Sequence, residues 1–321
     1  MSLSQTIIIP YHRNGAMLKY TTSQLEKIID SDVEIIVVGN NSNTRELDIE
    51  ISPRIKYIKI EDSLLYSKTA NLGVSIAKGD IITLCDQDVF SYSNWYYPLL
   101  KKLEANRKIG SVSSKLLSPA TNRIIDFGIE YSDQRIVHTL RGHMYNHPLA
   151  MLDRKVTSTT SATFMTYKSL YQQVGGMDLD MPYCCSDCDI GIKISLEGYE
   201  NWVVADSVAY HKGSSSNING KKQSFDYLKE DSHIMFWLKN KHRLTATVEK
   251  DLKVSIDYIR KNLKTLYTFI NLSSSPEYKW YSAVFSEYAK ADISDIFSYR
   301  HNQGIYHDSL QIYDCVPYFF I

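Results

Sequence analysis

The sequence lacks an excess of charge of either sign, and it lacks long apolar runs. Lys and Arg together number 36, as do Asp and Glu, so the formal net charge is +0 at pH 7. Nucleic-acid-binding proteins need surplus basic residues to neutralise phosphates, so this balance argues against a nucleic-acid partner. No stretch approaches the roughly 20 consecutive apolar residues of a transmembrane helix. These absences favour an ordinary globular protein.

Cysteine is scarce, with five residues in 321, an odd number. The short polar start at Met1–Gln5 does not read as a signal peptide. We therefore expect a cytoplasmic protein with reduced thiols. Cys185 and Cys188 have C-x-x-C spacing, but no second pair accompanies them. We interpret them and Cys184 as packed thiols in preference to a redox or metal motif.

The common phosphate-binding motifs are also missing. The sequence has no G-x-x-x-x-G-K-[ST] and no G-x-G-x-x-G after a strand, which excludes the two commonest nucleotide-binding folds. It also lacks the N-terminal Gly/Arg-rich loop of sugar nucleotidyltransferases. His138, His143 and His147 lack cysteine partners and regular zinc spacing, so we do not expect a zinc site there.

What is present is an alternation of strand and helix patterns. Apolar runs predict strands at residues 6–10, 34–38 and 81–85, an alternating pattern predicts one at 55–60, and residues 201–207 are read as another strand. Helical spacing predicts helices at 15–30, 67–77, 167–174 and 186–197. Continuous apolar strands alternating with helices are typical of an α/β fold around a mainly parallel sheet. Residues 111–166 are less regular and predict mixed strands with an insertion. The flexible stretch at 213–220 predicts a boundary before a Lys- and Tyr-rich helical region.

Polar residues follow three of the predicted strands, at 10–12, 39–42 and 86–88. Ligands of such folds bind at the carboxyl ends of the strands, so these residues are expected to face one crevice. Asp86 and Asp88 can approach one Mg²⁺ or Mn²⁺ ion, which prefers oxygen ligands and bridges phosphates. A solvated turn is the alternative. His211 also follows a strand and either completes the metal site, contacts phosphate or is an ordinary loop histidine.

A second acidic motif, Ser186-Asp187-Cys188-Asp189, opens a predicted helix. Ser186 is the expected N-cap, and acidic residues in a first turn interact favourably with the helix dipole. That explanation needs no chemistry. The alternative is that one carboxylate is a general base that accepts a proton from a reacting hydroxyl.

Six segments, taken in order, carry a resemblance. They read TIIIPYHRN, EIIVVGNNS, SKTANLGVSIAKGDIITLCDQD, VGGMDLD, SDCDIGIKISLEGY and VADSVAYHKGSS. Together, from Thr6 to about Ser216, they resemble family 2 glycosyltransferases of the GT-A fold. The resemblance implies a Rossmann-like catalytic domain over residues 1–216, with a donor half to about 110 and an acceptor half over 111–216. A mostly helical region would follow at 217–321.

The resemblance implies roles for the donor-side residues. Pro10 and Tyr11 resemble the turn that lies against the nucleoside. Asn40 stands where the family usually has an Asp that reads the base, commonly uracil. Lys68 lies in a segment that commonly packs near the base or phosphates, and Asp86 would face the ribose or the metal.

Other residues match the family's metal ligands and its catalytic base. Asp88 and His211 match the family's metal ligands, and Asp187 matches the position assigned as base. Ser186 replaces the family's usual Glu. The segment 160–162 would line the acceptor side, and the irregular stretch 135–154, which includes Arg141, is either an acceptor loop or a surface excursion.

The resemblance implies an inverting, metal-dependent hexosyl- or N-acetylhexosaminyltransferase that uses Mn²⁺ or Mg²⁺ and a nucleotide-sugar, with a UDP-sugar favoured. The acceptor would be a saccharide or lipid-linked saccharide in surface polysaccharide biosynthesis. Peripheral contact with the inner face of the membrane and oligomerisation stay open. Two rivals remain. Asn40 and Ser186 leave room for a non-catalytic nucleotide-sugar-binding relative, and the C-terminal region leaves room for an assembly subunit.

Overall fold

A computed structural model describes residues 3–12, 14–40, 52–60, 65–132, 135–213, 232–240 and 243–244, without the side chains of Asn40, Ser132 and Arg135. Most of the C-terminal region predicted at 217–321 therefore lies outside the described residues, as does most of the predicted connector at 213–220. Residues 232–240 are helical. The domain boundary near residue 217 stays a prediction.

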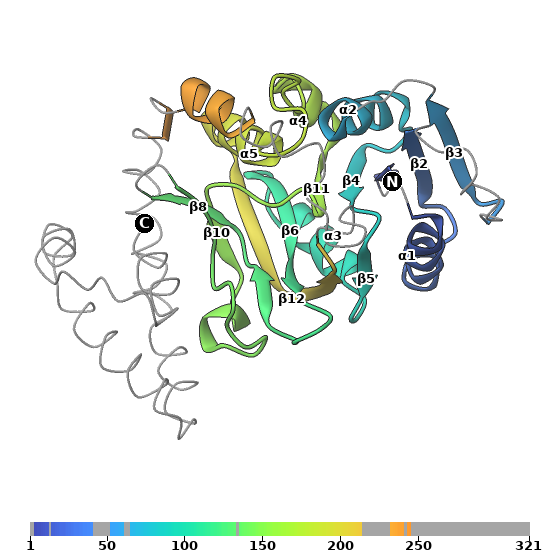
Figure 1. Cartoon of the computed structure of the whole chain (residues 1–321), viewed down its shortest axis with the longest axis horizontal. Coiled ribbons are helices and arrows are strands. Elements are labelled where there is room, and N and C mark those ends of the chain that lie inside the picture. Colours follow the sequence, from blue (N-terminus) through green and yellow to red (C-terminus); the bar gives the residue numbers. More distant parts are fainter. Residues whose placement is uncertain are drawn as a thin grey trace, which may run out of the picture.

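The described chain alternates strands and helices as the sequence predicts (Figure 1). The elements are β1 (Gln5–Tyr11), α1 (Gly15–Ile28), β2 (Glu34–Asn40), β3 (Ile55–Ile60), α2 (Tyr66–Ile76), β4 (Ile81–Cys85), β5 (Val89–Ser91), α3 (Tyr96–Ala105), β6 (Ile109–Leu117), β7 (Ile124–Asp126), β8 (Ile129–Ser132), β9 (Arg135–His138), the 3₁₀ helix η2 (Pro148–Met151), β10 (Arg154–Val156), β11 (Thr163–Tyr167), α4 (Lys168–Gln173), α5 (Ser186–Leu196) and β12 (Glu200–His211).

One mixed sheet forms the centre of the described molecule. Its strand order is β10-β12-β6-β11-β4-β1-β2-β3, with β5 added to β12 and β7 to β6. The strands β3, β2, β1 and β4 are parallel neighbours, and β6 and β12 are parallel to each other. Between these groups β11 runs antiparallel to both β4 and β6. The α/β fold with a mainly parallel sheet is therefore confirmed.

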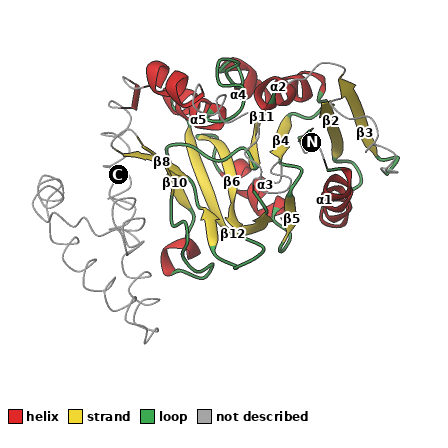
Figure 2. Ribbon diagram, viewed as in Figure 1, coloured by secondary structure: helices red, strands yellow, loops and turns green. Residues whose placement is uncertain are grey.

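Helices cover both faces of the sheet, which explains why central strands such as β1 and β4 are almost continuously buried (Figure 2). In β1, Ile7 and Ile9 pack into a core that includes residues of α1 and α3. The residue between them, Ile8, packs into a second core that includes residues of α2, α4 and α5. Because both faces are buried, no polar alternation is needed along the strand.

Gly73 lets α2 lie unusually close to the sheet. A Cβ atom at this position would collide with Ile8, and Val38 lies close by. The close approach fixes α2 against β1 and β2, and the first residue of α2, Tyr66, comes to the carboxyl end of β4, beside Asp86. A glycine in the middle of a helix is thus explained by packing.

Two details differ from the sequence expectation. The strand predicted at 201–207 continues to His211, because its last residues pair with β5. Ser186 is not the N-cap of α5. That position belongs to Cys185, whose φ of 66° is left-handed, and Ser186 is the buried first residue of the helix. Among the described helices, none is long and apolar enough to cross a membrane.

Candidate functional site

Strand pairing brings three predicted ligands together at the carboxyl end of β4. Asp86 and Asp88 lie between β4 and β5. Strand β5 pairs antiparallel with the end of β12, with Val89 opposite His211. In addition, the backbone N–H of Lys212 donates to the carbonyl of Asp88 at 3.1 Å. A residue more than 120 positions away in sequence is thereby held beside the two carboxylates.

The three side chains form a compact cluster. His211 Nε2 lies 3.2 Å from Asp88 Oδ1 and 3.5 Å from Asp86 Oδ2. One ligand atom from each residue lies within 4.8 Å of the others. Asp88 is only 4% exposed. Two carboxylates and an imidazole in this arrangement form a donor set that fits one divalent cation such as Mn²⁺.

The electrostatics of the cluster also fit a cation. Burial raises the pKa of Asp86 to about 6, an effect that His211 opposes and the charge of Asp88 reinforces. Burial by itself lowers the pKa of His211, but the hydrogen bond and charge of Asp88, with the charge of Asp86, outweigh it and the net shift is upward. The carboxylates of the buried Asp88 and the partly buried Asp86 repel each other, and a divalent ion would relieve that repulsion.

Neighbouring groups hold the turn at residues 86–88, the acidic turn, in place. The Tyr66 hydroxyl donates to Asp86 Oδ1 at 2.9 Å, and burial raises the pKa of Tyr66 well above its usual value, which keeps the hydroxyl protonated. The side-chain oxygen of Gln87 accepts from the backbone N–H of His12 at 2.9 Å. Its backbone carbonyl accepts from Thr21 Oγ1 at 2.6 Å. The turn is therefore tied to the end of β1 and to α1.

Asp187 lies in the first turn of α5 and is connected to the same edge. Its Oδ2 accepts from the backbone N–H of Ser161 at 3.1 Å, and its Oδ1 from the N–H of Cys188 at 2.9 Å. The Tyr66 hydroxyl that contacts Asp86 also approaches the carbonyl of Ser161 at 3.5 Å. Asp187 and Asp86 are thus linked through Ser161 and Tyr66.

Asp189 has a different environment from Asp187. It is fully buried, with Oδ2 2.6 Å from Lys193 Nζ and Oδ1 accepting from Asn240 Nδ2 at 2.9 Å. Asn240 belongs to the helical residues 232–240, so Asp189 anchors that segment on α5. Its surroundings favour a structural role.

The remaining predicted donor residues lie at or near the same edge. Pro10 and Tyr11 end β1 and are buried, and the Tyr11 ring packs in the main core. A nucleoside contact at this turn would therefore use the backbone. Lys68 is exposed on α2, two residues after Tyr66. Asn40 ends β2, but its side chain lies outside the described part of the chain.

An Asp–His pair that the sequence did not reveal lies near these residues. His138 Nδ1 is 2.6 Å from Asp126 Oδ2. Burial opposes protonation of His138, but Asp126 and the charge of Asp187 together raise its pKa. The charge of Asp126 in turn acts on His211. No motif marks this pair, because its members come from two short strands of the irregular stretch.

The rest of that irregular stretch packs elsewhere. The rings of His143 and His147 contact each other edge to face, with centroids 4.9 Å apart. Tyr145 is 38% exposed and lies 6.3 Å from the ring of Tyr92. Sequence reasoning did not predict Tyr66 or the pairing of Asp126 with His138, although it considered His138 as a zinc ligand and set it aside. Tyr66 carried a weak signal, an aromatic residue two positions before Lys68.

The fold, a mainly parallel sheet with helices on both faces, is of the GT-A class. The chain belongs to glycosyl transferase family 2, whose family model matches residues 6–170.

Curated relatives match over parts of their length. Polypeptide N-acetylgalactosaminyltransferase 10 of Homo sapiens is 30% identical over 112 residues, which cover 32% of this chain and 19% of the relative. O-antigen biosynthesis protein RfbC of Myxococcus xanthus is 21% identical over 239 residues, which cover 69% of this chain and 18% of RfbC. The chain thus spans less than a fifth of the length of these two proteins.

Solved structures share the fold. GalNAc-T7, crystallised with UDP, GalNAc and Mn²⁺, superimposes with a TM-score of 0.55 at 15% identity, covering 76% of this chain and 57% of GalNAc-T7. The mannosyltransferase PcManGT of Pyrobaculum calidifontis, in complex with GDP-Man and Mn²⁺, gives a TM-score of 0.50 at 14% identity, covering 90% of this chain and 85% of that protein. At such identities the likeness concerns the fold.

Proposed function

We propose that this protein is a metal-dependent inverting glycosyltransferase that moves a hexosyl or N-acetylhexosaminyl unit from a nucleotide-diphosphate sugar to a hydroxyl of a saccharide or glycolipid. The observation that carries the proposal is the convergence of Asp86, Asp88 and His211 at a sheet edge that contacts link to Asp187. A surface polysaccharide is the proposed product class. Its support is the similarity to an O-antigen biosynthesis protein.

Asp88 and His211 would hold Mn²⁺ or Mg²⁺, with Asp86 facing the ion or the ribose. When bound, the divalent ion would neutralise the negative charge that develops on the departing diphosphate. The two structural neighbours were solved with Mn²⁺ and with a nucleotide or nucleotide-sugar, which supports this assignment. One of them holds UDP and the other GDP-Man, so the two neighbours do not agree on the nucleotide. Binding tests on this chain decide which nucleotide it takes, and UDP is the first candidate.

Asp187 would act as general base in a single displacement. The acceptor oxygen forms a bond to the anomeric carbon, the bond from that carbon to the diphosphate oxygen breaks, and the acceptor proton passes to the carboxylate of Asp187. The N–H groups of Ser161 and Cys188 hold that carboxylate in place.

The decisive experiment measures nucleotide binding by thermal shift. The wild-type protein and the variants Asp88→Ala and Asp206→Asn are incubated with UDP, GDP, CDP and ADP, with and without Mn²⁺. A nucleotide at 100 times its dissociation constant should stabilise the protein by about 2.7 kcal/mol. Asp206 is exposed on β12, the strand that ends at His211, and is the matched control.

We expect a Mn²⁺-dependent shift with one nucleotide that persists in Asp206→Asn and disappears in Asp88→Ala. That nucleotide then selects the sugar donors for transfer assays. A panel without any metal-dependent shift would overturn the proposal and favour a binding or assembly role.

A further inference from the structure

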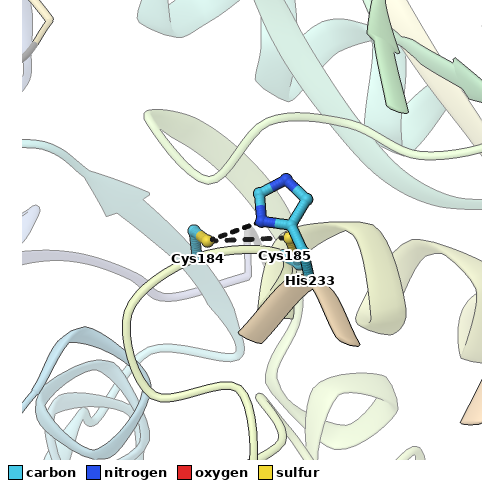
Figure 3. Close-up of side chains that lie close together, drawn as sticks. All are labelled: Cys184, Cys185 and His233. Atoms are coloured by element: carbon cyan, nitrogen blue, oxygen red, sulfur yellow. Dashed lines mark hydrogen bonds between the residues drawn. The ribbon is translucent and has the colours of Figure 1, made fainter. Parts of the chain in front are cut away.

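A second cluster of metal-ligating side chains lies away from the carboxylates. It consists of Cys184, Cys185 and His233, and one ligand atom from each lies within 4.8 Å of the others. The two cysteines end the loop that precedes α5, and His233 lies in the helical residues 232–240 (Figure 3). In Figure 3 the imidazole of His233 and both sulfur atoms lie together.

The distances in this cluster match a tetrahedral metal site. Cys184 Sγ is 3.6 Å from His233 Nδ1 and 3.6 Å from Cys185 Sγ. Around a tetrahedral zinc ion, with bonds of about 2.3 Å to sulfur and about 2.0–2.1 Å to nitrogen, two sulfurs lie about 3.8 Å apart and a sulfur and a nitrogen about 3.6 Å apart. Both distances from the Cys184 sulfur are therefore close to those that the ion requires, and the Cys185 and His233 ligand atoms lie within 4.8 Å of each other.

The ligand chemistry selects a soft cation. Thiolates together with imidazole favour Zn²⁺ over Mn²⁺ or Mg²⁺, which prefer oxygen ligands. We infer that Cys184, Cys185 and His233 form a binding site for Zn²⁺.

A disulfide between the two cysteines is the competing use of these thiols. The Cα atoms of adjacent residues are about 3.8 Å apart. Disulfides usually join Cα atoms that are about 4.4–6.8 Å apart, so a bridge between neighbours needs a distorted backbone. The left-handed φ of Cys185, 66°, belongs to a loop in which both sulfurs also reach His233. The geometry fits a shared ion better than a bond between the sulfurs.

The site would fasten one segment of the chain to another. Residues 232–240 already pack on α5 and its surroundings, since Asn240 donates to Asp189 and the ring of Phe236 stacks on Tyr131 at 5.5 Å. A zinc ion coordinated by His233 and by the two cysteines would cross-link the start of this segment to the loop before α5. The link lies two residues before Asp187, so under the proposed function it would steady the loop that carries the base.

The test measures zinc binding by the full-length chain with the carboxylate site disabled. An Asp88→Asn background is stripped with a chelator, and Zn²⁺ is titrated against a chromophoric chelator that competes for it. Cys184→Ser and His233→Ala are compared with Cys188→Ala in the same background. Cys188 is a buried thiol in the same stretch that is not part of the cluster, which makes it the matched control.

We expect one Zn²⁺ per chain in the background protein and in Cys188→Ala. Cys184→Ser and His233→Ala should bind Zn²⁺ more than tenfold more weakly, because loss of an outer partner alone costs about 10–100-fold in metal affinity. A visible Co²⁺–thiolate band should appear in the first two proteins and be weaker in Cys184→Ser, which keeps only the Cys185 thiol of the cluster. Equal Zn²⁺ affinity in all four proteins would overturn the inference.

Two further measurements complete the test. In the wild-type background, Mn²⁺-dependent nucleotide binding by Cys184→Ser shows that this variant folds, so a loss of Zn²⁺ binding reports on the site. A thiol titration without reductant detects a disulfide. A chain that holds a Cys184–Cys185 bridge, and that binds no Zn²⁺ after reduction, would also overturn the inference. Zinc binding does not depend on sugar transfer, so failure here is distinguishable from failure of the proposed function.

Discussion

The two candidate metal clusters among the described residues differ in chemistry and in the way the fold builds them. Asp86, Asp88 and His211 offer two carboxylates and an imidazole, and they come from the ends of paired strands. Cys184, Cys185 and His233 offer two thiols and an imidazole, and they join a loop to a helical segment outside the sheet. The same imidazole ligand is thus combined with hard oxygen donors in one cluster and soft sulfur donors in the other.

The difference shows how the position of a cluster affects its dependence on metal. Strands β4, β5 and β12 hold the carboxylate cluster in register whether or not an ion is bound, because backbone pairing fixes the strand ends. The thiol cluster depends on how residues 232–240 pack against α5. We therefore expect metal to organise charge in the first cluster and to join two segments in the second.

The largest effect is expected from the base, which belongs to neither cluster. Asp187→Asn keeps the size of the side chain but cannot accept the acceptor proton, so the transfer rate should fall by about 10²–10⁴-fold. Mn²⁺-dependent nucleotide affinity should stay within about threefold of the wild type, because the Asp187 side chain is not a metal ligand. A threefold change corresponds to about 0.7 kcal/mol, which is within the range for one lost hydrogen bond. Steady-state rates and calorimetric titration measure the two quantities. A variant that retains wild-type rates would remove Asp187 from the mechanism.

The next prediction tests whether the two clusters are independent. Asp88→Asn should weaken Mn²⁺-dependent nucleotide binding by more than about tenfold, because even outer partners of a metal contribute about that much. Cys184→Ser should leave this binding unchanged, because its sulfur lies in the other cluster. Isothermal titration on the two variants gives both values. Equal losses in both variants would mean that the clusters work as one unit.

The metal-free carboxylate cluster should also leave a mark on stability. A pKa raised by folding means that stability is fully present below the unfolded pKa and lost as pH rises through the folded pKa. For Asp86 the loss of stability falls between pH 3.8, its usual pKa, and a pH of about 6, its pKa in the folded protein. The raised pKa of His211 also makes stability fall as pH rises, at higher pH. The metal-free protein should therefore become less stable across this range.

Thermal unfolding between pH 4 and 8 measures this effect. Other groups titrate as well, so the informative quantity is the difference between the wild type and Asp86→Asn, which removes one of the titrating groups. That difference should shrink toward low pH, where Asp86 in the wild type is already neutral. A pH-independent difference would contradict the raised pKa of Asp86.

The smallest effect concerns the support of the carboxylate cluster. Tyr66→Phe removes the hydroxyl that donates to Asp86 and approaches Ser161, and keeps the ring. A hydrogen bond to a charged group contributes about 1.5–3 kcal/mol. Water can partly replace the lost Tyr66 hydroxyl as a donor to Asp86, so the net loss of stabilisation should be about 1 kcal/mol. We expect kcat/KM to fall by about fivefold, a change of about 1 kcal/mol. An unchanged kcat/KM would show that the contact does not support the site.

Much of the fold and part of the site could be predicted from local patterns. The strands β1, β2 and β4 and the helices α1 and α2 follow from apolar runs and helical spacing, because both faces of this part of the sheet are covered. The edge strand β3 follows from its alternating pattern. Asp86 and Asp88 follow a strand end directly, so their place at the sheet edge was also predictable. The pairing of Asp126 with His138 was not, since it joins two short strands whose sequences carry no periodicity.

By itself the sequence determined the α/β alternation, the acidic turn after β4 and the helix that begins with the motif of Asp187. These features depend on neighbouring residues, whose side-chain periodicity and turn chemistry act locally. Only the tertiary structure decided which distant groups meet. The pairing of β5 with β12 brings His211 to the carboxylates, and the packing of residues 232–240 on α5 brings His233 to the two cysteines, because such contacts depend on how whole elements bury their surfaces.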